Sequence, residues 1–506
     1  MRWLSTKLYR TLWQMHTQEK PLIRIIGYAL TVFIGMALFG YTVYRATHLS
    51  FTHDECETFK QYIYPGASFS DIIGMKVPTA NNHILNTLLM SACYHTLGNA
   101  EWMLRLPNLA GHLLFMVFTA LWLARFKNTL FLVLGFVIIN ANPYLLDFFG
   151  LARGYGLALG FMVASIYFFS RYLQQPSLGK MLWCLAVCVL AMISNIALMY
   201  YTMGLCFALN VVFIIHLSKT TKKTKPFIIG WIKLNLPIVL MLALCFLFFH
   251  DPVKRMVEHH AFYYGGSHFW EDTLGSLVNS CLYTPDKAWP YYMIVYIVVG
   301  LVAVGSGLVL NDLLTGKVST VMYPLLLVAV PSLATVLMHS LLGMNLLIFR
   351  VAIFLLVLFL MYVLALLRYG FQFPKGPLIA NALLWVFAGL FVYSFYLYAN
   401  ITHTQEWIYD ANDRDAINAI VKDVSLHHYQ DKVVKVGITW FVEPAMNYYR
   451  VTKNCYWLQG FTRDGVATGQ YDYYYVSKES LKELPKIPLR LMAYYPISGY
   501  SLFAKE

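Results

Sequence analysis

Long uncharged apolar stretches recur along this chain and limit what it can fold into. A run of roughly 20 apolar residues is long enough to cross a membrane as a helix, and residues 25–44 contain no charged side chain. Only 12% of the 506 residues are charged, whereas a soluble globular domain has about 25%. The pattern predicts an α-helical polytopic membrane protein with eleven spans, at 25–44, 104–124, 130–146, 151–173, 181–198, 200–217, 228–249, 291–310, 321–341, 346–367 and 378–398.

Lysine and arginine residues between the predicted spans indicate their orientation. Arg24 precedes the first span, Arg125 follows the second, and Arg368 and Lys375 follow the tenth. If the spans alternate, these groups share one side, and positively charged loops stay in the cytoplasm. We therefore expect a multi-pass protein of the inner (plasma) membrane with a cytoplasmic N-terminus and a periplasmic C-terminal domain. This orientation accounts for the net charge of +13, so no nucleic-acid partner is expected.

Polarity divides the chain into three parts. Residues 1–24 form a basic cytoplasmic segment, and residues 25–400 form a transmembrane domain with outer loops at 45–103 and 250–290. The polar tail, 401–506, has apolar residues at helical spacing from Ile417 to Val424. Its runs 433–439 and 471–476 are typical of strands. The tail is therefore predicted to be a small extracytoplasmic α/β domain.

An acidic pair, Asp54 and Glu55, follows the outer end of the first span. Adjacent helical residues point about 100° apart, so the two carboxylates cannot flank one bond as the paired carboxylates of hydrolases do. We expect one to act as a base, and the other to orient it or to bind a metal or a sugar hydroxyl. Asp147 is a second carboxylate that arrives from another span. The alternative is that these boundary carboxylates are simply solvated.

Cationic side chains reach the same predicted face. Arg153 and Arg350 lie near the outer ends of the fourth and tenth spans. A guanidinium group suits bidentate phosphate binding, although a boundary arginine can also snorkel to water. Three outer histidines, His83, His259 and His260, have the chemistry of metal ligands, although such loop residues are often inert.

Several short motifs resemble, in their order and in their placement on one membrane face, those of the GT-C glycosyltransferases. The most similar branch holds the aminoarabinose transferases to lipid A, the rhizobial lipopolysaccharide-core transferases and proteins like the protein mannosyltransferases. The likeness covers roughly residues 25–400. The motifs are Thr-His-Asp-Glu at 52–55, Asn-His-Ile-Leu at 82–85, an Arg-Leu-Pro turn at 105–107, Ala-Arg-Gly-Tyr at 152–155 and Phe-Arg-Val at 349–351. The chain departs from the family where prolines usually follow the basic position at His83, and where Asn82 replaces a common acidic residue.

The resemblance implies a fold and a reaction. Family members form a helical bundle with a cavity that opens outward, and they transfer a sugar from a polyprenyl-phosphate carrier, usually with inversion. The expected partners are a polyprenyl-phosphate-linked sugar donor, membrane lipids and an acceptor that is a lipid, a glycan or a protein. The short inner connections offer no room for a nucleotide-binding domain, which agrees with a lipid-linked donor.

The roles implied for individual residues combine both lines of reasoning. Asp54 is expected to be the general base for an acceptor hydroxyl. The leaving lipid phosphate needs cations, which we expect to be Arg153 and Arg350 with help from His83.

The remaining candidates concern the acceptor and a metal. Glu55 and Asp147 are expected to hold the acceptor or a metal. The cofactor is left open: a divalent metal is compatible with the resemblance, and His259 and His260 are the candidate ligands elsewhere in the outer loops.

Other classes of protein also have many spans and boundary charges. A transporter or flippase of polyprenyl-linked glycans is one alternative, but the sequence has no inverted repeat and little charge inside the spans, both common in transporters. A glycan polymerase or ligase, which depends less on an acidic pair after the first span, and a membrane scaffold that displays the tail are further alternatives. Sugar transfer and the length of the transferred glycan distinguish among them.

Overall fold

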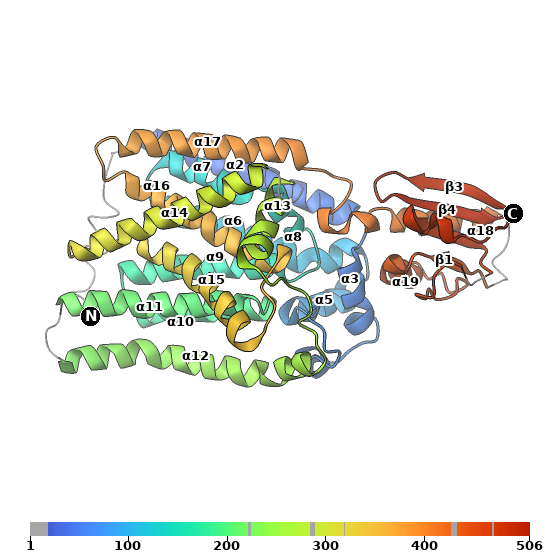
Figure 1. The fold of residues 1–506 in the computed structure, drawn as a ribbon, viewed down its shortest axis with the longest axis horizontal. Helices are drawn as coiled ribbons and strands as arrows, with labels where there is room; N and C mark the ends of the chain where they lie inside the picture. Colours follow the sequence, from blue (N-terminus) through green and yellow to red (C-terminus); the bar gives the residue numbers. More distant parts are fainter. Residues whose placement is uncertain (1–18, 221–223, 284–288, 318, 427–432, 468–469) are drawn as a thin grey trace.

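A bundle of long apolar helices carries a small α/β domain at one end, in a computed structural model (Figure 1). The structure describes residues 19–220, 224–283, 289–317, 319–426, 433–467 and 470–506. This architecture confirms the predicted fold class of a polytopic helical membrane protein with a C-terminal α/β domain. Most of the predicted basic segment, residues 1–18, lies outside the described residues.

Within the described residues, nine helices are long and apolar enough to cross a membrane. They are α2 (Pro21–His48), α6 (Glu101–Ala124), α9 (Tyr155–Gln174), α11 (Leu198–Thr220), α12 (Thr224–Glu258), α14 (Trp289–Leu314), α15 (Met322–Leu342), α16 (Ile353–Gly370) and α17 (Gly376–Tyr398). The other two predicted spans correspond to the shorter α10 (Leu178–Ser194) and to the pair α7 (Thr129–Asn140) and α8 (Pro143–Phe149). Each predicted span therefore overlaps a helix or a helix pair, and the full count of eleven crossings stays a prediction.

The predicted span at 130–146 is not one straight helix. α7 and α8 meet at a bend of 72°. The Asn142 side chain accepts a hydrogen bond from the Leu145 N–H at 3.0 Å, and Pro143 has no N–H to continue the helical ladder. A capping asparagine followed by proline starts a new helix. The bend turns α8, all of whose residues are buried, away from the direction of α7.

Short helices build the end of the bundle that bears the α/β domain. In the loop 45–103 they are α3 (His53–Thr58), η2 (Phe59–Ile63), α4 (Phe69–Ile73) and α5 (Ile84–Leu97). Later in the chain they are η3 (Phe269–Leu274), α13 (Gly275–Leu282) and η4 (Phe349–Ala352).

The predicted loop 250–290 begins as helix, because α12 continues to Glu258. Its last turns pack on the first outer loop: Met256 is buried in a cluster with Met75 and Ile84, and Arg255 Nη1 donates to the Gly74 carbonyl at 3.0 Å. This packing extends the helix beyond the boundary that polarity indicates.

The α/β domain begins just after α17. Its elements are η5 (Gln405–Asp410), α18 (Asp413–Leu426), β1 (Val436–Ile438), η7 (Trp440–Val442), α19 (Glu443–Thr452), β2 (Tyr473–Ser477), η8 (Glu479–Glu483), β3 (Leu489–Tyr495) and β4 (Tyr500–Lys505). The sheet has the order β1-β2-β4-β3, with β1 and β2 parallel and the other pairs antiparallel. The predicted helix and the two predicted strands are confirmed, as α18, β1 and β2.

The strands β3 and β4 have no counterpart in the sequence-based prediction. β3 is largely solvent-accessible at the sheet edge, so its residues lack the apolar alternation of a half-buried strand. A turn at Gly499, whose φ is +73°, returns the chain from β3 to β4. Glycine tolerates this left-handed conformation without a steric penalty.

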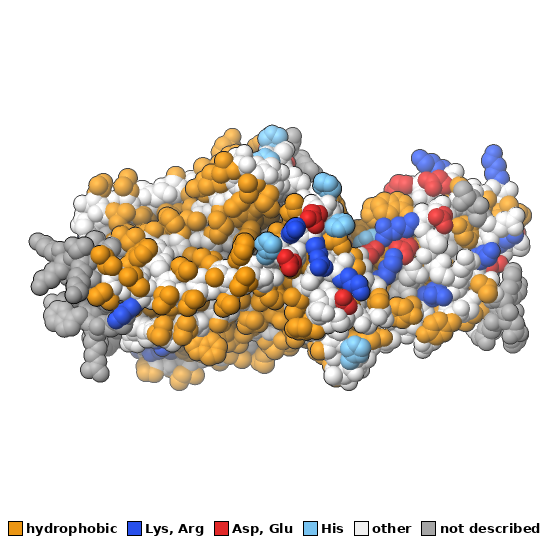
Figure 2. Space-filling model, turned by 90° about the horizontal axis from the view of Figure 1, so that it is seen from below, with side chains coloured by type: hydrophobic (Ala, Val, Ile, Leu, Met, Phe, Trp, Pro, Cys, Tyr) orange, Lys and Arg blue, Asp and Glu red, His pale blue; other side chains and the backbone are white. Residues whose placement is uncertain are grey.

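Charge marks the end of the bundle that bears the domain. Hydrophobic side chains cover much of the visible face of the bundle, and acidic and basic groups gather where the bundle meets the domain (Figure 2). α6 begins at this end, where Glu101 pairs with Arg414 of the domain at 3.3 Å, and it runs toward Arg125 at the far end. The separation of the two ends agrees with the predicted topology. The cytoplasmic side itself stays a prediction from the charge pattern.

Candidate active site

The first turn of α3 positions the predicted base. Thr52 precedes the helix, and its N–H donates to Glu55 Oε2 at 2.9 Å, which closes a capping box. The His53 N–H donates to Asp410 Oδ2 of the α/β domain at 2.5 Å. The start of α3 is thus fixed from two directions, so Asp54 follows α2 in a defined orientation at the end of the bundle that bears the α/β domain.

Both predicted arginines converge on one carboxylate oxygen of Asp54. Arg153 Nη2 lies 3.2 Å from Asp54 Oδ2, and Arg350 Nη2 lies 3.3 Å from the same oxygen. Arg153 comes from the turn before α9 and Arg350 from η4 before α16. The structure therefore brings together three of the residues that the sequence singled out from segments far apart in the chain.

The electrostatics of this cluster keep Asp54 ionised. Burial raises the pKa of the Asp54 carboxyl, but the positive charges of Arg153 and Arg350 outweigh burial and leave the pKa below its usual range. The side chain is 15% exposed, so it is not sealed from a substrate. At neutral pH Asp54 is a carboxylate that can accept a proton or a hydrogen bond.

Arg153 is anchored rather than extended to water. Its side chain is only 3% exposed, and its Nη1 donates to the Asn81 carbonyl at 3.1 Å. A Cβ at the next residue, Gly154, would lie 2.0 Å from the Ser194 carbonyl oxygen. Glycine is thus needed for the close approach of this turn to the end of α10. This burial argues against a snorkelling role for Arg153.

Arg350 lies between two aromatic rings. Its Cζ is 4.8 Å from the centroid of the Tyr264 ring and 4.9 Å from that of Trp407. Its Nη1 donates to Glu406 Oε2 at 2.7 Å, and Glu406 Oε1 accepts from the Tyr144 hydroxyl at 2.6 Å. The rings hold the planar guanidinium group in place.

Sequence reasoning missed the partners of Arg350. Glu406 and Trp407 lie in η5, directly after the last span, and Tyr264 lies in the outer loop after α12. The signal that could have found Glu406 and Trp407 is their position: an acidic and an aromatic residue just past the end of a span, as for Asp54. The sequence predicts that the tail and the loop 250–290 shape the acceptor side of the site, but it singles out none of these three residues.

His83 lies behind the arginines. It is 6% exposed, and its ring contacts Tyr155 edge-on with the centroids 4.9 Å apart. Burial lowers the pKa of His83 well below its usual range, and the charges of Arg153 and Arg350 lower it further. His83 is therefore a neutral imidazole, and its Nε2 has no hydrogen-bond partner among the described residues.

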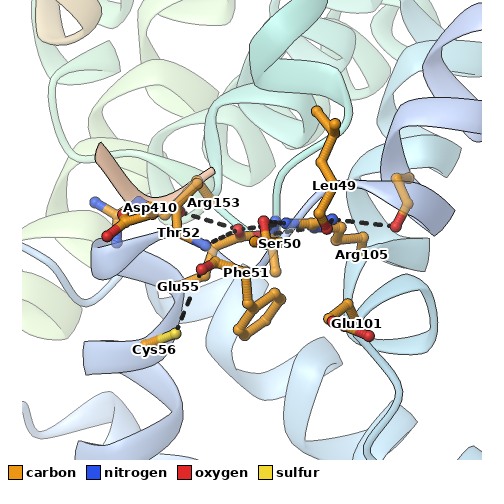
Figure 3. A network of polar contacts seen from close by, with 12 residues as sticks. Leu49, Ser50, Phe51, Thr52, Glu55, Cys56, Glu101, Arg105, Arg153 and Asp410 are labelled. Carbon is orange, nitrogen blue, oxygen red and sulfur yellow. Dashed lines mark hydrogen bonds and ion pairs between the residues drawn. The ribbon is translucent and has the colours of Figure 1, made fainter. Parts of the chain in front are cut away.

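Glu55 lies apart from this cluster. It is fully buried and forms a double ion pair with Arg105, at 2.9 Å from Nε to Oε1 and 2.8 Å from Nη2 to Oε2 (Figure 3). Oε1 also accepts from the Ala152 N–H. The role expected for Glu55, binding the acceptor or a metal, needs an accessible face that the structure does not give it. The motif 105–107 is likewise not a turn, because it lies inside α6.

Asp147 is also turned away from Asp54. It is 4% exposed and pairs with Arg45 Nη2 of α2 at 2.6 Å. Its Oδ2 accepts from the Gln405 N–H at 3.0 Å, next to Glu406 in the chain. Arg45 in turn donates to the His403 carbonyl at 2.9 Å. Asp147 thus fixes the segment between α17 and the α/β domain. Its contact there, Gln405, directly precedes Glu406, which touches Arg350.

The candidate metal ligands do not converge. His259 and His260 are exposed residues after α12, and His260 has a φ of +53°. The part of the chain that the structure describes contains no group of three or more His, Cys, Asp or Glu side chains arranged to hold a metal ion.

Comparison with known proteins finds similarity only at the level of structure. No protein-family model and no curated protein matches the chain. Two crystal structures of ArnT from Cupriavidus metallidurans, one in the apo state and one bound to undecaprenyl phosphate, align over 94% of this chain and 97% of theirs. The identity is 12% and the TM-score is 0.46 for both.

Proposed function

We propose that this protein is a GT-C-type glycosyltransferase that moves a sugar from a polyprenyl-phosphate-linked donor to an acceptor hydroxyl at the outer face of the membrane. The observation that carries the proposal is the convergence of Arg153 and Arg350 on Asp54. An ionised carboxylate supplies the base, and two guanidinium groups supply the cations that a leaving phosphate requires.

The reaction follows from these groups. The acceptor oxygen attacks the anomeric carbon and forms the new C–O bond, while the bond from that carbon to the phosphate oxygen breaks. Asp54 takes the acceptor's proton. The phosphate leaves with the bonding electron pair and binds Arg153 and Arg350, with the neutral His83 imidazole as a further hydrogen-bond donor.

Donor binding would also activate the base. In the empty site the two arginines hold the pKa of Asp54 low, which makes it a weak proton acceptor. A phosphate on the same guanidinium groups partly neutralises them, so the pKa of Asp54 rises toward the working pH. A base is most effective when its pKa lies near that pH. Asp54 would therefore become a competent base only when the donor is in place.

The position of the arginines suits a lipid-linked donor. Arg153 precedes α9 and Arg350 precedes α16, so both lie at the outer ends of apolar helices. A phosphate at this depth would lie at the membrane interface, and an isoprenoid chain would extend among the helices. Nucleotide sugars are made in the cytoplasm, so a site on the outer face needs a donor that crosses on a lipid.

We therefore expect the purified protein to release undecaprenyl phosphate from undecaprenyl-phosphate-linked sugars and to be inactive with the matching nucleotide sugars. Mass spectrometry of the lipid and of the glycosylated acceptor measures both products, with a panel of lipid-linked sugars and a membrane extract as the acceptor source. Transfer from a nucleotide sugar without carrier lipid would refute this donor. Repeated addition of sugar would identify a polymerase, and a flippase would release no polyprenyl phosphate.

The planar fork of Arg153 gives a second prediction. Arg153→Lys keeps the charge but loses the paired N–H donors, and the loss of one donor to a developing anion costs roughly 10²-fold in turnover. We expect a fall of about this size in the initial rate of transfer. Arg171→Lys is the control, because Arg171 lies at the far end of the same helix, α9, where its Nη1 donates to the Tyr167 hydroxyl at 3.0 Å. Equal rates for the two variants would count against phosphate binding by Arg153.

A further inference from the structure

The guanidinium group of Arg350 is already occupied by carboxylates. Its Nη1 donates to Glu406 at 2.7 Å and its Nη2 faces Asp54 at 3.3 Å. The centroids of the Tyr264 and Trp407 rings lie 4.8 and 4.9 Å from its Cζ. A donor phosphate that binds Nη1 and Nη2 of Arg350 together therefore has to take the place of one of the two carboxylates.

Formal charge leads to the same requirement. Arg153 and Arg350 contribute two positive charges, and Asp54 and Glu406 contribute two negative charges within one contact network. The four groups balance, so an added phosphate would leave an uncompensated negative charge in a site where three of the four side chains are 15% exposed or less. Such a charge is costly in a poorly hydrated environment. Binding becomes favourable when one carboxylate leaves the arginines.

Glu406 is the carboxylate that can leave. Asp54 is held by two arginines, whereas Glu406 contacts one arginine and the Tyr144 hydroxyl. Its segment, η5, contains a non-helical residue, Trp407, with φ −124° and ψ 43°. The Gln405 N–H stays bonded to Asp147, so the Glu406 side chain can rotate outward without unfolding the connection to the α/β domain.

We propose that Glu406 occupies the phosphate position on Arg350 in the empty enzyme and is displaced by the donor phosphate. Glu406 then acts as a positioning residue: it holds the Arg350 fork in the orientation that the phosphate needs, and it competes with that phosphate. This inference rests on the proposed function, because it takes Arg350 to be a phosphate ligand.

The test measures the affinity of the full-length protein in detergent for undecaprenyl phosphate, by native mass spectrometry and by fluorescence titration. Glu406→Gln keeps the shape and an oxygen for the Tyr144 hydroxyl but removes the competing charge. We expect Glu406→Gln to bind undecaprenyl phosphate about tenfold more tightly than the wild type, since weakening one competing charge-assisted hydrogen bond changes a dissociation constant by roughly that factor. Glu406→Ala, which removes the carboxylate altogether, should also bind more tightly.

Glu101→Gln is the matched control. Glu101 also accepts from an arginine and a tyrosine hydroxyl, Arg414 at 3.3 Å and Tyr449 at 3.1 Å, and its side chain is 16% exposed. Because Glu101 does not touch Arg350, the affinity of Glu101→Gln for undecaprenyl phosphate should equal that of the wild type. A wild type that does not bind undecaprenyl phosphate would refute the proposed function. If the wild type binds undecaprenyl phosphate and both Glu406 variants bind it equally well or more weakly, the proposal that Glu406 is displaced is wrong. The proposed function would still stand.

Discussion

Asp54→Asn should lower the rate of sugar transfer by about 10²–10⁴-fold, the usual contribution of general-base catalysis. Asparagine keeps the shape of the side chain and an oxygen that accepts from Arg153 and Arg350, but it cannot take the acceptor's proton. The yield of folded protein and its melting temperature should change little, because Asp54 is 15% exposed and each arginine keeps another acceptor, the Asn81 carbonyl for Arg153 and Glu406 for Arg350. Initial rates at saturating lipid-linked donor measure the effect, normalised to monodisperse protein.

Asp147→Asn is the informative comparison. Asp147 holds the segment after α17 through Arg45 and Gln405 and does not contact Asp54 in the structure. Its loss should lower stability more than the rate per folded molecule. If Asp54→Asn keeps most of its activity and folded Asp147→Asn loses it, the base is Asp147 and the proposed chemistry at Asp54 is wrong.

The sequence predicted the parts of this protein that depend on apolar length and on charge at span boundaries. The spans are visible because no isolated backbone polar group is tolerated in lipid, so each crossing is a helix with an apolar surface. Asp54, Arg153 and Arg350 were found because ionisable residues are costly near the membrane and are retained where they have a function. If the spans alternate across the membrane, these three residues lie at the same end of the bundle, which made their meeting predictable.

What the sequence did not predict depends on contacts between distant segments. Asp54 and Glu55 are neighbours and look alike in sequence, but Arg105 lies opposite Glu55 and Arg350 lies opposite Asp54. The bend before Pro143 and the placement of Glu406 beside Arg350 likewise depend on how segments pack. No local pattern indicates which of two adjacent carboxylates will meet an arginine in the core and which will meet one in the site.

The acidic pair therefore divides into two roles. Glu55 and Arg105 are both fully buried, and Arg105 also donates to the carbonyls of Leu49 and Ser50 at 2.9 Å. These contacts tie the end of α2 to α6 and to the start of α3 (Figure 3). The pair thus supports the backbone that carries Asp54, and its expected contribution is to stability.

We expect Glu55→Gln to lower the free energy of unfolding by about 3–5 kcal/mol, the usual cost of leaving one charge of a buried ion pair without its partner. Thermal unfolding in detergent and the yield of monodisperse protein measure this loss. Glu258→Gln is the control, because its contact with Lys254 is between exposed side chains at 3.9 Å, and exposed pairs contribute little. Molecules of Glu55→Gln that do fold should transfer sugar within a few-fold of the wild-type rate. Asp54→Asn should show the opposite pattern, with stability kept and activity lost. A Glu55→Gln protein that is as stable as the wild type but inactive would place Glu55 in the chemistry and would overturn this division of the pair.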